Sequence, residues 1–186
     1  MFACSRGVAI DPLDKVYASI GEFVVAFQWA ENKYRETGWF ILDPERKDWP
    51  PRALRKETNS ELINKVTNLY SDLVDKYDLP SSLERRADML RLQAVFHQLR
   101  KFRNTLLHAA FIELKAGGDV TGMLRSDPKS MVDTETGEIQ DVELVTEAKI
   151  AVSMEVLSRA SRDLGQHYIQ LVHWAPFTRF KLRPRS

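Results

Sequence analysis

Apolar residues recur every three or four positions along much of the chain, which is the spacing of one face of an α-helix. The first such stretch begins at Asp11-Pro12, because Asp can cap free amides and Pro suits the first helical position. It is predicted to end at Gly38. Residues 39–52 contain three prolines and no sustained period, so they are predicted to form an irregular connection within one domain.

Two further helices are marked by their first residues. The segment Thr58–Glu61 has the spacing of a capping box and precedes an apolar stripe that ends before Pro80, which predicts a second helix. The segment Ser81–Glu84 repeats this spacing, and neither Gly nor Pro occurs again before Gly117. The third helix is therefore predicted to be long and to end at that glycine.

The helical period disappears between residues 119 and 145, where a turn-rich segment at 133–137 lies between short apolar segments and predicts a β-hairpin. A fourth amphipathic helix is predicted over 150–171, followed by a basic tail at 176–186. The predicted fold over residues 1–186 is a single, mainly all-α domain. It consists of a bundle of four to five helices with the hairpin inserted between the third and the fourth.

Composition narrows the possible functions only slightly. The chain has 27 Lys and Arg against 26 Asp and Glu in 186 residues, a net charge of +1, so a polyanion would have to be bound by a local cluster. Cys4 is the only cysteine, which excludes an intrachain disulfide or a thiolate metal cage. Without a signal-peptide core or a membrane-length apolar run, we expect a cytoplasmic protein that uses no membrane, metal or cofactor.

The third predicted helix carries the candidate chemistry. On a helical wheel its polar stripe consists of His97, Lys101, Asn104 and His108. Arg103 instead falls within the apolar arc, where a guanidinium needs an anion or a route to water. Glu31 is the ionisable exception on the apolar face of the first helix, so a Glu31–Arg103 ion pair is predicted. Such a pair can also serve only to fix the register of two helices.

The segment Phe102-Arg103-Asn104-Thr105-Leu106-Leu107-His108-Ala109 resembles the motif of HEPN domains, the higher eukaryote and prokaryote nucleotide-binding family. In that motif an Arg, often followed by a polar residue such as Asn, precedes a His with four to six residues between them, late in a long helix of an α bundle. Arg162 and His167 have the same spacing, but the wheel places Arg162 on a solvated face. We interpret this second match as a coincidence.

The resemblance implies a metal-independent endoribonuclease that acts as a homodimer and leaves 2′,3′-cyclic phosphate and 5′-hydroxyl ends on RNA. It implies that His108 transfers a proton, that Arg103 stabilises charge on the phosphorane, and that Asn104 orients the phosphate or the histidine. Glu31, Lys101 and Arg100 would support the site. Residues expected to contact the RNA backbone are Arg179, Lys181, Arg183 and Arg185. Family members include toxins with antitoxin partners and phage-defence effectors.

Two other hypotheses remain open at this point. One is a non-catalytic HEPN-like dimer that binds nucleotides, RNA or a protein. The other is a structural helical bundle in which the Glu31–Arg103 pair only fixes the register. Cleavage of RNA in the presence of EDTA, compared with the same assay on His108→Ala, would distinguish the enzyme from the binding module.

Overall fold

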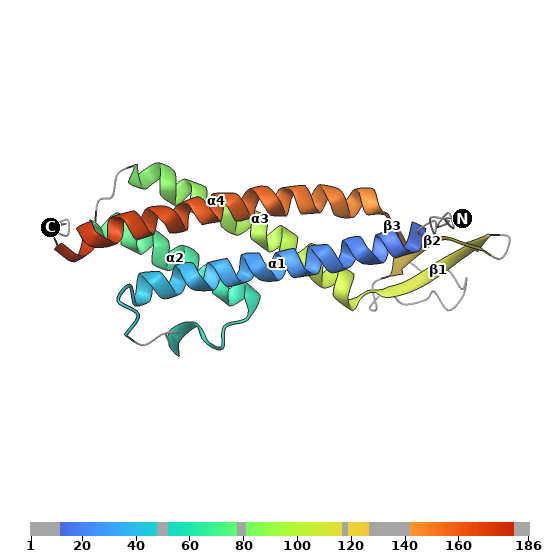
Figure 1. Cartoon of the computed structure of the whole chain (residues 1–186), viewed down its shortest axis with the longest axis horizontal. Helices are drawn as coiled ribbons and strands as arrows, with labels where there is room; N and C mark the ends of the chain where they lie inside the picture. The colour runs from blue at the N-terminus through green and yellow to red at the C-terminus, as the bar shows by residue number, and fades with distance from the viewer. Residues whose placement is uncertain (1–11, 48–51, 78–80, 117–118, 127–141, 181–186) are drawn as a thin grey trace, which may run out of the picture.

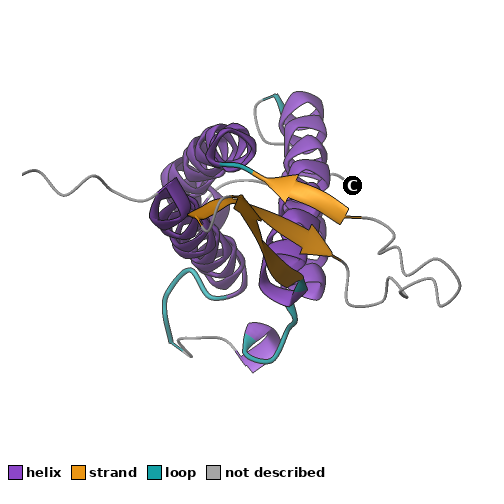
Figure 2. Ribbon diagram, turned by 90° about the vertical axis from the view of Figure 1, so that its right-hand side faces the viewer, coloured by secondary structure: helices purple, strands orange, loops and turns teal. Residues whose placement is uncertain are grey.

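The computed structural model describes residues 12–47, 52–77, 81–116, 119–126 and 142–180. Its helices are α1 (Pro12–Leu42), the short 3-10 helix η1 (Arg52–Leu54), α2 (Asn59–Tyr77), α3 (Ser82–His108) and α4 (Glu147–Phe180). Its strands are β1 (Ala110–Ala116), β2 (Asp119–Ser126) and β3 (Val142–Val145). The fold is therefore mainly all-α with a small antiparallel β insertion between the third and fourth long helices, as predicted (Figures 1 and 2).

The helices pack lengthwise around an aromatic core. Helix α3 runs antiparallel to α1, and the two are joined by edge-to-face ring pairs between Phe23 and Phe102 and between Tyr34 and Phe96, with centroids 5.1 and 4.9 Å apart. Helix α4 lies beside α1 and runs in the same direction (Figure 1). In the described part of the chain, no helix is both long enough and apolar enough to span a bilayer.

The predicted end of the first helix at Gly38 is wrong, because α1 continues to Leu42. The glycine serves close packing instead. A Cβ at position 38 would lie 2.5 Å from Leu54 Cδ1 and 2.7 Å from Val66 Cγ2, closer than atoms can approach. Because Leu54 and Val66 are fully buried, only a residue without a side chain lets η1 and α2 approach α1 here.

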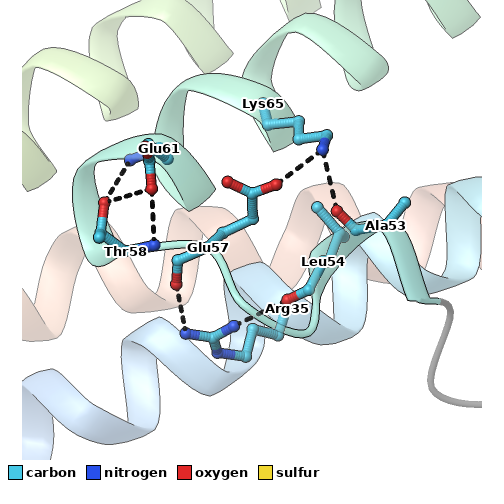
Figure 3. A network of polar contacts seen from close by, with 7 residues as sticks. All are labelled: Arg35, Ala53, Leu54, Glu57, Thr58, Glu61 and Lys65. Atoms are coloured by element: carbon cyan, nitrogen blue, oxygen red, sulfur yellow. Dashed lines mark hydrogen bonds and ion pairs between the residues drawn. The ribbon is translucent and has the colours of Figure 1, made fainter.

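The predicted capping box at the start of α2 is confirmed. The Thr58 backbone N–H donates to Glu61 Oε2 at 2.9 Å, and the Glu61 N–H donates to Thr58 Oγ1 at 3.4 Å (Figure 3). The Thr58 hydroxyl and N–H lower the pKa of Glu61 by stabilising its carboxylate. The second predicted capping box is wrong, because Ser81 has a left-handed backbone (φ 57°) and its side chain forms no capping bond.

Helix α3 ends at His108 rather than at Gly117, and β1 follows after Ala109, whose backbone is extended. From Ile112 to Lys115 the side chains of β1 alternate between apolar and charged. The strand pairs with β2 along its whole length. This pairing with the next strand overrides the helix propensity of the segment. The β insertion therefore begins at residue 110 rather than at about 119.

The second apolar segment of the predicted hairpin, which covers Ile139, Val142 and Leu144, is described from Val142 onward, where it forms β3 and pairs with β2. The predicted turn at 133–137 and the short apolar segment before it lie outside the described residues. Helix α4 confirms the predicted fourth helix and extends it to Phe180, so residues 176–180, including Arg179, belong to that helix rather than to a tail. Lys181, Arg183 and Arg185 lie outside the described residues.

The two faces of the sheet have different environments. On one face Met123 and Val145 are buried, next to the start of α1. On the other face four apolar side chains each keep more than a third of their surface exposed, next to the less exposed Leu124; they are Ile112, Leu114, Val142 and Leu144. Glu143 of β3 pairs with Arg125 of β2 and with Lys149 of α4, which ties the sheet to the last helix.

Candidate functional site

The motif residues lie at the carboxyl end of α3, at the end of the bundle where the sheet is inserted (Figure 1). Arg103 and Asn104 are half-buried in the last turns of the helix, and His108 is its exposed final residue. The site therefore presents one histidine at a helix terminus, whose exposed carbonyls favour nearby positive charge.

Arg103 is held by an aromatic ring and an amide rather than by an acid. Its guanidinium lies 5.5 Å from the centroid of the Phe27 ring on α1, and its Nη1 donates to Asn104 Oδ1 at 3.4 Å. The predicted Glu31–Arg103 ion pair is not formed, because Glu31 accepts from Arg35 Nη2 at 2.8 Å. The half-buried Arg103 instead has its guanidinium against the Phe27 ring, as in a cation–π contact.

Glu31 belongs to a structural clamp in the second half of α1, one turn after Phe27. Its partner Arg35 also donates to the backbone carbonyl oxygens of Leu54 at 3.0 Å and Glu57 at 3.3 Å (Figure 3). Lys65 of α2 pairs with the Glu57 carboxylate at 2.7 Å. These contacts fasten the connection before α2 to both helices. Glu31 thus acts through Arg35 on the fold, and the structure does not bring it together with Arg103.

The end of α3 carries positive charge that forms no ion pair with an acid among the described residues. Between Asp88 and Glu113 the chain contains no acidic residue. In the described part of the chain, no ion pair involves the four basic residues at this end of the helix, Arg100, Lys101, Arg103 and His108. The buried Nε of Arg100 has no hydrogen-bond partner. A guanidinium without a carboxylate partner, such as that of Arg103, is suited to a phosphate.

His97, the first member of the predicted polar stripe, faces α2. Its Nε2 lies 2.7 Å from Asn64 Oδ1, a hydrogen bond between α3 and α2. Partial burial, followed by the charges of Arg100 and Lys101, lowers the pKa of His97. The ring is therefore neutral at pH 7 and contributes to helix packing.

The second Arg–His match separates into two unrelated residues. Arg162 is exposed, as the wheel predicted, but His167 is only 7% exposed. The Nδ1 atom of His167 lies 2.8 Å from the Tyr70 hydroxyl of α2, and the two rings meet edge to face. Sequence reasoning missed this buried pair. The available signal was that His167 falls between Leu164 and Leu171, on the apolar stripe of α4.

The buried His167 is expected to make the stability of the fold depend on pH. Burial is the main cause that lowers its pKa; Arg85 and Arg91 add to this, while Asp88 and Asp163 oppose it. The unfolded chain takes up a proton near pH 6.5, whereas the folded ring does so only at lower pH. Between these two pH values the unfolded state binds more protons than the folded state. The free energy of unfolding is therefore highest above about pH 6.5 and falls as the pH is lowered below that value.

Thermal unfolding measured between pH 7.5 and 5 tests this prediction. The midpoint should fall over that range for the natural sequence and fall less for His167→Gln, which keeps an acceptor for the Tyr70 hydroxyl. His97→Gln is the comparison: the pKa of His97 is also lowered but this residue is less buried, so its replacement should reduce the pH dependence less than His167→Gln does. An unchanged pH dependence in His167→Gln would contradict the prediction. Glu61 and Glu143 also make stability depend on pH, because their pKa values are lowered in the folded protein. Their contribution to stability is lost only below about pH 4.5, outside the range of this experiment.

Open grooves lie elsewhere among the described residues, and Arg103, Asn104 and His108 line none of the three with volumes above 300 Å³. These three have volumes of about 310, 320 and 510 Å³ and lie beside the sheet, between α3 and α4, and between α1 and α4. Among the described residues, no three His, Cys, Asp or Glu side chains gather as metal ligands would. Comparison of the chain with protein-family models, curated proteins and solved structures finds no match.

Proposed function

We propose that this protein is a metal-independent endoribonuclease of the HEPN type, with Arg103, Asn104 and His108 at its active site. The observation that carries the proposal is the unpaired Arg103, which contacts Asn104 at a helix end without acidic residues. A structural arginine on an apolar face would be expected to hold a carboxylate, and Arg103 holds none among the described residues. The resemblance to the HEPN motif extends the proposal to a toxin or phage-defence effector.

In the proposed reaction the ribose 2′-hydroxyl attacks the adjacent phosphorus. His108 takes the hydroxyl proton as the new O2′–P bond forms, and Arg103 stabilises the added negative charge on the phosphorane. The P–O5′ bond then breaks, the leaving oxygen takes a proton from water, and protonated His108 returns its proton to the solvent. The products are a 2′,3′-cyclic phosphate and a 5′-hydroxyl. Asn104, which accepts from Arg103, would orient the guanidinium toward the phosphate.

The proposed site needs two copies of the chain. Arg103 and His108 are five positions apart on one helix, which separates their directions by about 140°. Arg103 is half-buried toward Phe27, whereas His108 is exposed. A two-fold dimer brings identical surfaces together, so the helix end of one copy can supply Arg103 and that of the other His108.

Mixing two inactive variants tests the composite site. His108→Ala and Arg103→Ala homodimers should each be inactive, because every site lacks one group. Random exchange of subunits makes half of the dimers mixed, and one of the two sites in each is then complete, so about a quarter of the natural activity should return. RNA cleavage before and after subunit exchange, in EDTA, is the measurement. A double variant mixed with either single variant is the control and should restore nothing.

Two results would contradict the proposal. A monomer by light scattering at micromolar concentration would exclude the composite site. A stable dimer that binds RNA without cleaving it would support the second hypothesis, a non-catalytic HEPN-like binding module.

A further inference from the structure

A groove of about 510 Å³ follows the seam between α1 and α4, which lie side by side in Figure 1. Its floor is apolar and includes the buried residues Ala30 and Leu157. The volume is within the range of sites that hold small ligands. The groove lies away from the motif residues, none of which lines it.

Trp29 stands at this groove with 71% of its surface exposed. An indole is among the largest apolar surfaces a side chain can offer, and it is usually covered for most of its area. Among the described residues, Trp29 forms no hydrogen bond or ring contact. Its flat face is therefore available to a planar group.

The charges that line the groove are all positive. Arg162 of α4 is exposed and has no ion pair among the described residues, and the hydroxyls of Ser158 and Ser161 are beside it along the same helix. Lys33 of α1 lies 4.6 Å from the Tyr168 ring centroid and pairs with Glu36, which does not line the groove.

The neighbouring groove between α3 and α4 provides a comparison. It also contains two basic residues, Arg91 and Arg159, but Glu155 and Asp163 line it as well. Arg159 pairs with Glu155 and Arg91 pairs with Asp88. The positive charge is thus balanced in that groove and unbalanced in the one beside Trp29.

We propose that the groove between α1 and α4 binds a nucleotide unit, with the base stacked on Trp29 and the phosphate at Arg162. A planar aromatic group joined to an anion matches an exposed indole beside an unpaired guanidinium and two hydroxyls. The unit can be a free ribonucleotide or one residue of a single-stranded RNA. The site stands apart from the proposed nuclease site, and its test measures binding rather than cleavage.

The test uses the full chain carrying His108→Ala, so that bound RNA is not consumed. Calorimetric titration with AMP and fluorescence anisotropy with a labelled oligoadenylate distinguish the two sources of the nucleotide. Because stacking on an aromatic side chain contributes about 5- to 150-fold to affinity, Trp29→Ala should weaken binding by that factor and Trp29→Phe by less. Arg162→Gln should also weaken binding. The matched control is Arg159→Gln, on the same helix but paired in the other groove.

Binding of AMP would identify a free nucleotide as the ligand, and binding of the oligonucleotide alone would identify a strand of RNA. Either supports the proposal only if Trp29→Ala and Arg162→Gln weaken binding and Arg159→Gln does not. The proposal is overturned if neither probe binds, or if all variants bind equally. It is also overturned if Trp29→Ala turns a dimer into a monomer in sedimentation, because the groove would then be an interface between copies.

Discussion

Replacement of His108 by alanine is expected to reduce the rate of RNA cleavage by a factor of about 10² to 10⁴, which is the usual contribution of a general acid or base. Stability should hardly change, because His108 is exposed and no hydrogen bond or ion pair ties it to another described residue. Cleavage of an end-labelled RNA in EDTA measures the rate, and circular dichroism with thermal unfolding measures the fold. The cleaved ends should be 2′,3′-cyclic phosphates.

Two further variants sharpen this experiment. His173→Ala removes an exposed histidine of α4 and should leave cleavage unchanged. Arg103→Lys keeps the positive charge but loses the planar donors that match a phosphate, so it should be nearly as inactive as Arg103→Ala. Equal cleavage by His108→Ala and the natural sequence would show that the ribonuclease proposal is wrong. The same conclusion would follow if EDTA abolished cleavage.

The largest effect on stability is expected for Arg35→Ala. This change leaves the Glu31 carboxylate, only 7% exposed, without its partner, and it frees the carbonyl oxygens of Leu54 and Glu57. Removing one member of a buried pair typically costs 3–5 kcal/mol. Because Arg35 keeps 19% of its side chain exposed, we expect a loss at the lower end of this range. The free energy of unfolding, measured by urea denaturation, should fall by about 3 kcal/mol.

Lys33→Ala is the matched control on the same helix. Its pair with Glu36 is about two-fifths exposed on both sides, so its loss should cost less than about 1 kcal/mol. The double variant Glu31→Gln with Arg35→Met should recover part of the loss, since no buried charge is then left alone. If Arg35→Ala and Lys33→Ala were equally mild, the clamp between α1 and the connection before α2 would not stabilise the fold.

The four long helices could be predicted because their apolar period is local and covers many turns. The end of α3 could not. Residues 109–116 contain no Gly or Pro, and their helix propensity resembles that of the preceding turns. They form β1 because they pair with β2, which in turn pairs with β3. Such strand pairing leaves only a weak mark on the sequence of β1, here the alternation of Ile112, Glu113, Leu114 and Lys115.

The features of the candidate site that depend on the local helical period could be predicted, and those that depend on how two helices pack could not. The wheel placed Arg103 and Glu31 correctly as ionisable residues on buried sides of their helices. It contains no information about height along the axis, and so it could not show that Glu31 lies next to Arg35 rather than Arg103. The i, i+4 spacing of Glu31 and Arg35 was the signal for the pair that forms. The contact of Arg103 with Phe27 depends on how α1 and α3 cross, which the sequence alone does not specify.

The packing of the last helix, α4, against α1 and α2 determines when the chain can finish folding during its synthesis. The buried hydrogen bond between Tyr70 and His167 joins residues 97 positions apart. A ribosome adds roughly 5–20 residues per second, so about 5 to 20 s pass between the appearance of these two side chains. During that interval the apolar surfaces of α1 and α2 that α4 covers remain in water. Nascent chains stalled before Glu147 are therefore expected to bind chaperones and to be degraded by proteases, whereas chains that include α4 resist both.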